Sequence, residues 1–186
     1  MAEAGRRRSR RKWSRPQALV AVVAVALVAA AAVLSTGNPD PAPTDRRDNP
    51  SDVLSVELAT FDGGAVALGD YAGRPMVVNF FASWCGPCAR EMPDFEAVHA
   101  ARGDEVAFIG VSLQDTPEAA QALAERTGVT YDLVRDTDSE LFRAVGGTSM
   151  PTTVFISASG EVVDVHGGEL PARMLEERID RLLAAA

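Results

Sequence analysis

The chain contains two cysteines, Cys85 and Cys88, and both lie where an apolar run gives way to a helical pattern. The run Met76 to Phe81 predicts a buried strand, and the segment Ala89 to Ala101 predicts a helix. The chain must therefore adopt a fold in which a buried strand leads straight into a helix. A cysteine at a helix start lies beside unpaired backbone N–H groups and the positive end of the helix dipole, which favour its thiolate. This placement predicts a redox-active dithiol.

The spacing gives each thiol a different expected role. Cys85 is the expected nucleophile, and Cys88, one helical turn further on, is the expected resolving thiol that attacks a mixed disulfide on Cys85. Pro87 suits the first helical turn, where its missing N–H has no helical partner. Gly86 leaves no side chain beside the attacking sulfur.

Two other uses of the cysteines are disfavoured. The chain has no second Cys-X-X-Cys, and His99 and His166, which we expect to be exposed and without a role, lack the spacing of zinc ligands. A purely structural disulfide would close so short a loop that it adds little stability. We therefore expect no metal and no bound cofactor beyond a redox-active Cys85–Cys88 disulfide.

The N-terminal residues predict export. Residues 1–15 are rich in Arg and Lys, although the net charge of the whole chain is −8, and an apolar run follows from residue 18 to 34. We expect a basic cytoplasmic segment over 1–15 and an uncleaved transmembrane signal-anchor over 16–35, which places the rest outside the cytoplasm. Cleavage and secretion is the alternative, and a twin-arginine route stays open. The acidic remainder disfavours nucleic-acid binding.

The rest of the chain predicts a linker and one domain. Residues 36–51 are rich in proline and predict a disordered linker, and residues 52–186 predict a globular domain. Alternation over 53–61 and the apolar stretch 65–68 predict an N-terminal β-hairpin. Further strands are expected at 106–113, 131–134, 152–156 and 162–166. Helices are expected at 117–126, at 140–145 with Asp138 and Ser139 as its cap, and from 171. This order predicts an α/β domain with a mixed central sheet flanked by helices.

The segment Asn79 to Pro93, NFFASWCGPCAREMP, resembles the active-site segment of thioredoxin-fold proteins. The resemblance is to the TlpA/ResA group of exported thiol-disulfide oxidoreductases, and Met150-Pro151-Thr152-Thr153 extends it. It covers roughly residues 52–186. It implies a thioredoxin fold with an N-terminal β-hairpin extension and an inserted strand-helix region.

The resemblance also implies roles for other residues. Pro151 matches the cis-proline that faces the redox cysteines, and Met150 would line the groove beside it. Glu91 matches the acidic residue of the ResA group, and we expect it to transfer protons and tune the resolving thiol. Asn79 stands where cytoplasmic thioredoxins have a buried aspartate, and Trp84 is expected to offer substrates an apolar surface. The expected substrate-binding residues are Trp84, Gly86, Pro87, Met150 and Pro151.

Together these features predict a monomeric, membrane-tethered reductase of disulfides in exported proteins, re-reduced by a thiol electron donor of the membrane. The resemblance adds cytochrome c maturation, with apocytochrome c as substrate. A disulfide-forming oxidant is the alternative within redox chemistry, because the sequence does not fix the reduction potential. A non-redox anchored binding module or chaperone is the alternative from another class.

Overall fold

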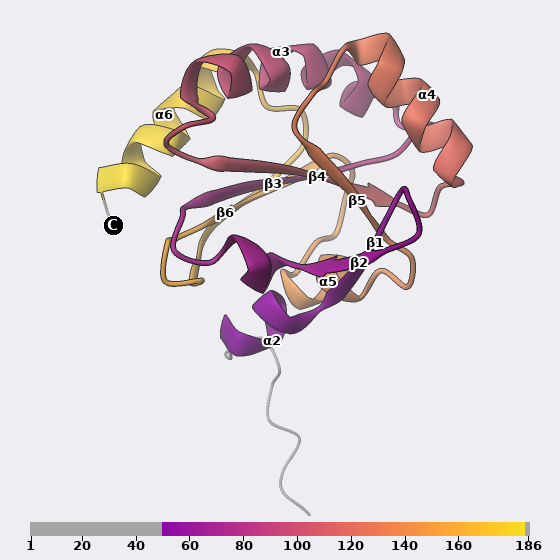
Figure 1. Ribbon diagram of the computed structural model, residues 1–186. Coiled ribbons are helices and arrows are strands. Elements are labelled where there is room, and N and C mark those ends of the chain that lie inside the picture. Colours follow the sequence, from indigo (N-terminus) through magenta and orange to yellow (C-terminus); the bar gives the residue numbers. More distant parts are fainter. Residues whose placement is uncertain (1–49, 185–186) are drawn as a thin grey trace, which may run out of the picture. The chain divides into compact units, whose positions relative to one another are not determined.

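The computed structural model describes residues 50–184, whose strands form one seven-stranded mixed sheet (Figure 1). The strands are β1 (Glu57–Thr60), β2 (Ala65–Ala67), β3 (Met76–Phe81), β4 (Ala107–Leu113), β5 (Asp132–Asp136), β6 (Thr152–Ile156) and β7 (Val162–Gly167). Their order in the sheet is β2-β1-β5-β4-β3-β6-β7. The central strands β3, β4 and β5 are parallel, and the remaining pairs are antiparallel. This is the predicted thioredoxin-like mixed sheet.

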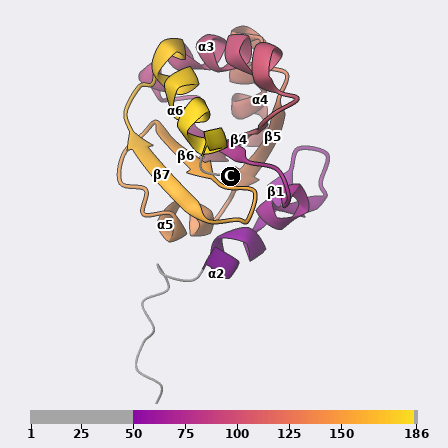
Figure 2. The same ribbon diagram turned by 90° about the vertical axis from the view of Figure 1, so that its left-hand side faces the viewer.

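Helices cover both faces of the sheet. The helices are α2 (Pro50–Ser55), the 3-10 helix η2 (Leu68–Tyr71), α3 (Gly86–Arg102), α4 (Pro117–Thr127), α5 (Glu140–Ala144) and α6 (Ala172–Ala184). Figure 1 shows α3, α4 and α6 on one face, and α2, η2 and α5 on the other. Figure 2 shows the antiparallel pair β6–β7 at one end of the sheet.

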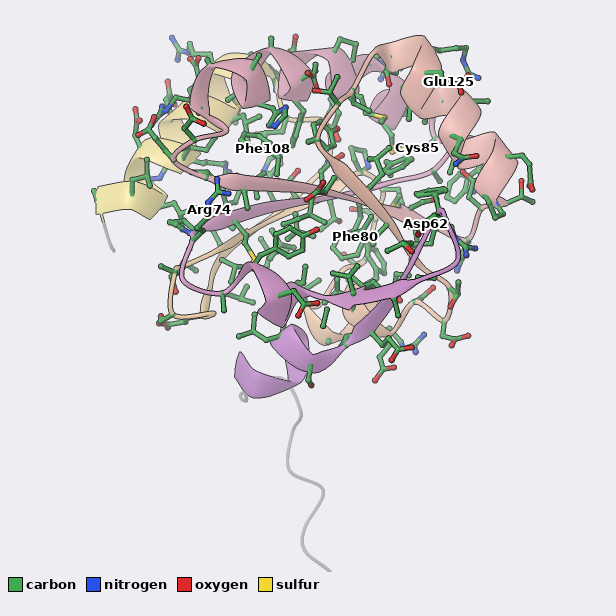
Figure 3. All side chains as sticks on the ribbon, in the orientation of Figure 1. Asp62, Arg74, Phe80, Cys85, Phe108 and Glu125 are labelled. Carbon is green, nitrogen blue, oxygen red and sulfur yellow. A yellow bond between two sulfur atoms is a disulfide. The ribbon has the colours of Figure 1, made fainter. Side chains whose placement is uncertain are left out.

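The central strand β3 is buried along its whole length because both of its faces are covered. Met76, Val78 and Phe80 belong to the core on the α5 side, whereas Val77 belongs to the core beneath α3 and α6. This alternation follows from the two-residue period of a strand. Figure 3 shows the labelled side chains of Phe80 and Phe108 on opposite faces of the sheet. The strand therefore fixes which residues face α3 and the cysteines.

The predicted segments 1–15 and 16–35, and the linker up to residue 49, lie outside the described residues. Among residues 50–184 there is no helix with the length and apolarity that a membrane crossing requires.

Two local predictions were wrong. Residues 53–55 are the end of α2 rather than strand, and only β1 and β2 form the predicted antiparallel hairpin. Val53 and Val56 are both buried, and a spacing of three is compatible with a helix as well as with an irregular strand.

At α5, the Ser139 side chain makes no capping bond. Instead the carboxylate of Asp136 accepts the N–H groups of Glu140 and Phe142, each at 2.9 Å.

Gly147 lies between α5 and the segment that leads into Pro151, and it has no room for a side chain. A Cβ placed on it would lie 2.3 Å from a ring carbon of Phe142, whose ring packs edge-on against Phe80. We expect Gly147→Ala to lower the free energy of unfolding by about 1–3 kcal/mol, as overpacking does.

Urea unfolding of the oxidised protein measures this loss. The control is Gly86→Ala, because a Cβ at Gly86 would meet only Arg90 Nη1, at an ordinary 3.7 Å. Equal stability of the Gly147→Ala variant and wild type would contradict the prediction.

Candidate active site

Cys85 and Cys88 form a disulfide at the start of α3, with Cys85 as the N-cap residue (Figure 3). The Sγ atom of Cys85 accepts the backbone N–H of Cys88 at 3.2 Å. Cys85 is 5% exposed and Cys88 is fully buried. An N–H group of the first helical turn, which has no partner within the helix, therefore donates to the sulfur of Cys85, the more accessible cysteine. The sequence predicted that Cys85 would lie beside such N–H groups.

The two residues between the cysteines open the helix. Gly86 is exposed and Pro87 is partly buried, and they are its first two residues. The disulfide packs in a small apolar cluster that α3 and α4 share. Its other buried members are Phe81, Ala82, Met92, Ala120 and Leu123. This apolar packing leaves the disulfide accessible mainly on its Cys85 side.

The predicted substrate-facing residues come from two segments, residues 84–87 and 150–151. The Met150–Pro151 peptide bond is cis, as predicted, and Met150 packs against the cluster that contains the cysteines. The buried Pro151 accepts the N–H of Gly168 at its carbonyl oxygen. Trp84, just before Cys85, is 59% exposed. The structure thus packs Met150 against the apolar cluster around the redox pair and leaves most of the Trp84 side chain exposed.

Glu91 is on the buried side of α3 and is only 1% exposed. Its Oε1 accepts the side-chain N–H of Asn79 at 2.8 Å, and its Oε2 accepts the backbone N–H of Leu170 at 2.8 Å. Burial raises the pKa of Glu91 to about 7; the two hydrogen bonds oppose this rise, and the carboxylates of Glu169 and Asp94 add to it. A carboxyl group with a pKa near neutrality therefore lies one helical turn beyond Cys88.

Asn79 connects Glu91 to the sheet. It lies on β3, and its amide nitrogen also approaches Thr153 Oγ1 at 3.4 Å. Within the described part of the chain, its buried Oδ1 has no hydrogen-bond partner. The sequence singled out Asn79 and Glu91 but did not predict that they contact each other. It also did not predict the hydrogen bond from Leu170, which lies 79 residues after Glu91 in the chain. No local signal indicates such a contact.

Both histidines are partly buried, so the expectation of exposed rings was wrong. The His99 ring packs edge-on against Phe108 and Tyr131. His166 Nδ1 lies 3.1 Å from Arg178 Nη2. Neither ring belongs to the apolar cluster around the cysteines. In residues 50–184, no group of three or more His, Cys, Asp or Glu side chains is arranged to hold a metal ion.

Comparison with known proteins identifies a family and several relatives. The family model "Redoxin" matches residues 37–183. The thiol-disulfide oxidoreductase ResA of Halalkalibacterium halodurans is 31% identical over 125 residues, which are 67% of this chain and 71% of ResA. The thioredoxin-like protein YneN of Bacillus subtilis is 28% identical over 126 residues, which are 66% of this chain and 74% of YneN.

Two solved structures are also similar to this chain. The structure of MTB dsbF in its mixed oxidized and reduced forms is 30% identical, with a TM-score of 0.66, and the match covers 70% of this chain and 97% of that one. A putative thiol:disulfide interchange protein DsbE from Chlorobium tepidum is 27% identical, with a TM-score of 0.63, and the match covers 69% and 92%.

Proposed function

This chain belongs to the Redoxin family and is a thiol-disulfide oxidoreductase of the TlpA/ResA type, and we propose that it reduces disulfides in exported proteins outside the cytoplasm. The observation that carries this proposal is the Cys85–Cys88 disulfide at the N-terminus of α3. Met150 of the cis Met150–Pro151 bond packs against the cluster that contains it, and the buried carboxyl group of Glu91 lies one helical turn beyond Cys88.

The proposed reaction begins with the reduced dithiol. The Cys85 thiolate attacks one sulfur of the partner disulfide, forms a mixed disulfide and releases the first partner thiolate. Cys88 then loses its proton and attacks the Cys85 sulfur, which releases the second partner thiolate. Two electrons pass to the partner, the two protons of the dithiol neutralise its thiolates, and the Cys85–Cys88 disulfide remains.

Glu91 is the proposed proton acceptor for Cys88. The resolving thiol is fully buried, so water alone is a poor acceptor for its proton. A carboxyl group whose pKa is raised to about 7 is partly ionised at neutral pH and can accept that proton. The hydrogen bonds from Asn79 and Leu170 fix the orientation of this carboxyl group.

The proposed binding site for the partner lies along Trp84, Gly86, Pro87, Met150 and Pro151. Trp84 offers an exposed ring, and the cis Pro151 segment offers extended backbone to a substrate strand. Trp84 directly precedes Cys85, and Met150 packs against the apolar cluster that contains both cysteines. We propose no metal and no further cofactor for the reaction.

The cellular setting of the proposal rests on the sequence. The basic residues 1–15 and the apolar run 18–34 support a signal-anchor over 16–35 and a domain outside the cytoplasm. We propose that a thiol donor of the membrane restores the dithiol. Apocytochrome c, whose cysteines must be reduced before haem attachment, is the proposed substrate within this class. We propose that the protein acts as a monomer.

The reduction potential of the dithiol tests the direction of electron flow. The full-length protein in detergent is equilibrated with glutathione or dithiothreitol buffers, and its free thiols are counted by alkylation. A reductase is expected to have a potential near or below about −200 mV, whereas a value near about −120 mV would identify a disulfide-forming oxidant. Absence of a reversible dithiol would contradict both and favour a binding module.

A further inference from the structure

A second set of hydrogen bonds joins the segment before the disulfide to the loop between β4 and α4. Asp115 in that loop accepts the backbone N–H of Ser83 at Oδ2, at 2.5 Å, and the Ser83 hydroxyl at Oδ1, at 2.8 Å. The next residue, Trp84, donates its indole N–H to the carbonyl oxygen of Gln114 at 3.2 Å. Two neighbouring loop residues therefore hold the two residues that precede Cys85.

These contacts are not required to start α4. Thr116 is the N-cap of that helix, and its Oγ1 accepts the N–H of Ala119 at 3.2 Å. Asp115 also accepts the N–H of Thr116 at Oδ1, but both of its carboxylate oxygens bond to Ser83. Gln114 has a φ of 52°, in the left-handed region that non-glycine residues seldom adopt. The loop thus has an unusual backbone bend where it meets the active-site segment.

The segment that the loop holds determines where the reactive groups lie. The Cys85 N–H donates to the Ala82 carbonyl at 3.1 Å, so residues 82–85 form a tight turn. Trp84 projects from this turn with most of its side chain exposed. The hydrogen bond from the indole nitrogen to Gln114 restrains the orientation of the ring in the absence of a partner. A preorganised surface reduces the conformational entropy that binding costs.

We propose that Asp115 is a positioning residue for the recognition of protein disulfides, and that it acts through Ser83 and Trp84. This inference rests on the proposed function. A protein disulfide must dock on the Trp84 surface before Cys85 can attack it, whereas a small disulfide needs only the Cys85 thiol. Asp115 therefore determines the KM for protein substrates and has little influence on exchange with small disulfides.

The test compares full-length wild type with Asp115→Ala on two substrates. Insulin, reduced with dithiothreitol as electron source, reports on protein disulfides. The pre-reduced protein mixed with dithionitrobenzoate in a single turnover reports on a small disulfide. We expect kcat/KM for insulin to fall about tenfold, the scale of one charge-assisted hydrogen bond, and to fall through KM. The rate with dithionitrobenzoate should change less than about twofold.

Two controls separate positioning from charge and folding. Asp104→Ala removes an exposed carboxylate just beyond the opposite end of α3, and it should leave both rates unchanged. In a Trp84→Ala background, Asp115→Ala should cause no further loss with insulin, because the residue through which it acts is already gone.

Three results would overturn the inference. Equal losses on both substrates would show that Asp115 supports the thiol site or the fold in general. An unchanged KM for insulin, or a full additional loss in the Trp84→Ala background, would show that Asp115 does not act through the indole. Wild type that reduces neither substrate would refute the proposed function itself, a different outcome that also removes the inference.

Discussion

Cys85→Ser is expected to lower the rate of disulfide reduction by about a thousandfold or more, to the rate of the uncatalysed exchange. Serine preserves the shape of the N-cap and can accept the same N–H of Cys88, but its hydroxyl cannot form a mixed disulfide. The folded structure should therefore persist while the chemistry is lost. Insulin reduction and a thermal unfolding curve, measured on the same sample, check both parts.

Cys88→Ala is expected to fail at the following step. Attack by Cys85 proceeds, but no resolving thiol is present, so the partner stays covalently attached as a mixed disulfide. A non-reducing gel should show an adduct that dithiothreitol releases, and the Cys85→Ser variant should show none. The reverse pattern, with an adduct on Cys88 in the Cys85→Ser variant, would exchange the two roles.

Glu91→Gln is expected to change how stability depends on pH. The pKa of Glu91 is raised from 4.5 to about 7 in the fold, so the folded state holds its proton more tightly than the unfolded state. The contribution of Glu91 to stability is therefore greatest below pH 4.5, falls as the pH rises through this window, and does not change further above it. The loss amounts to roughly 3 kcal/mol, and the variant should not suffer it. Urea unfolding of the oxidised forms at pH 4.5 and pH 8 measures the difference.

Glu96→Gln is the matched control on the same helix. Burial would raise the pKa of Glu96, but the two hydrogen bonds from Thr130 and the nearby His99 hold it below its usual value. The ionised form of Glu96 therefore stabilises the fold above its unfolded pKa, and this contribution is lost as the pH falls. Replacing Glu96 should cost more stability at pH 8 than at acid pH, the opposite sign to Glu91. Parallel curves of stability against pH for wild type and Glu91→Gln would contradict the raised pKa of the buried Glu91.

The same Glu91 variant also tests the proposed proton transfer. In wild type the resolving step should accelerate as the pH passes through about 7, because the ionised carboxylate accepts the proton of Cys88. The Glu91→Gln variant should lack this rise. A preformed mixed disulfide is allowed to decay at several pH values. Samples that are quenched in acid at successive times give the rate of this step. If the rate rises with pH in the same way in the variant, the group that titrates is a thiol and not Glu91.

The sequence predicted those features of the site whose residues are neighbours in the chain. The Cys85–Cys88 pair, the strand before it and the helix after it lie within one short segment, so spacing and hydrophobic pattern suffice to predict them. The cis Met150–Pro151 bond was predicted from a resemblance, because no local physics distinguishes it from an ordinary loop proline.

The parts that the sequence did not reveal depend on distant partners. The burial of Glu91 requires a backbone N–H from Leu170, and the hold on Ser83 requires a carboxylate 32 residues away. The sequence pattern around a glutamate one turn beyond Cys88 is the same whether its side chain faces water or the sheet. At α2 the difficulty was different, because two buried valines three residues apart fit a helix and an irregular strand almost equally well.

The unpaired Oδ1 atom of Asn79 has a consequence for how the buried site tolerates a change of charge. A carboxamide has a donor at one end and an acceptor at the other, so a half turn of its plane exchanges them. In the present orientation the amide N–H donates to Glu91 Oε1, which suits the ionised carboxylate; after the half turn its oxygen could accept the proton of the neutral acid. A leucine at this position could form neither hydrogen bond. Asn79 can therefore serve as a reversible partner, which keeps a hydrogen bond to Glu91 in both protonation states of each catalytic cycle.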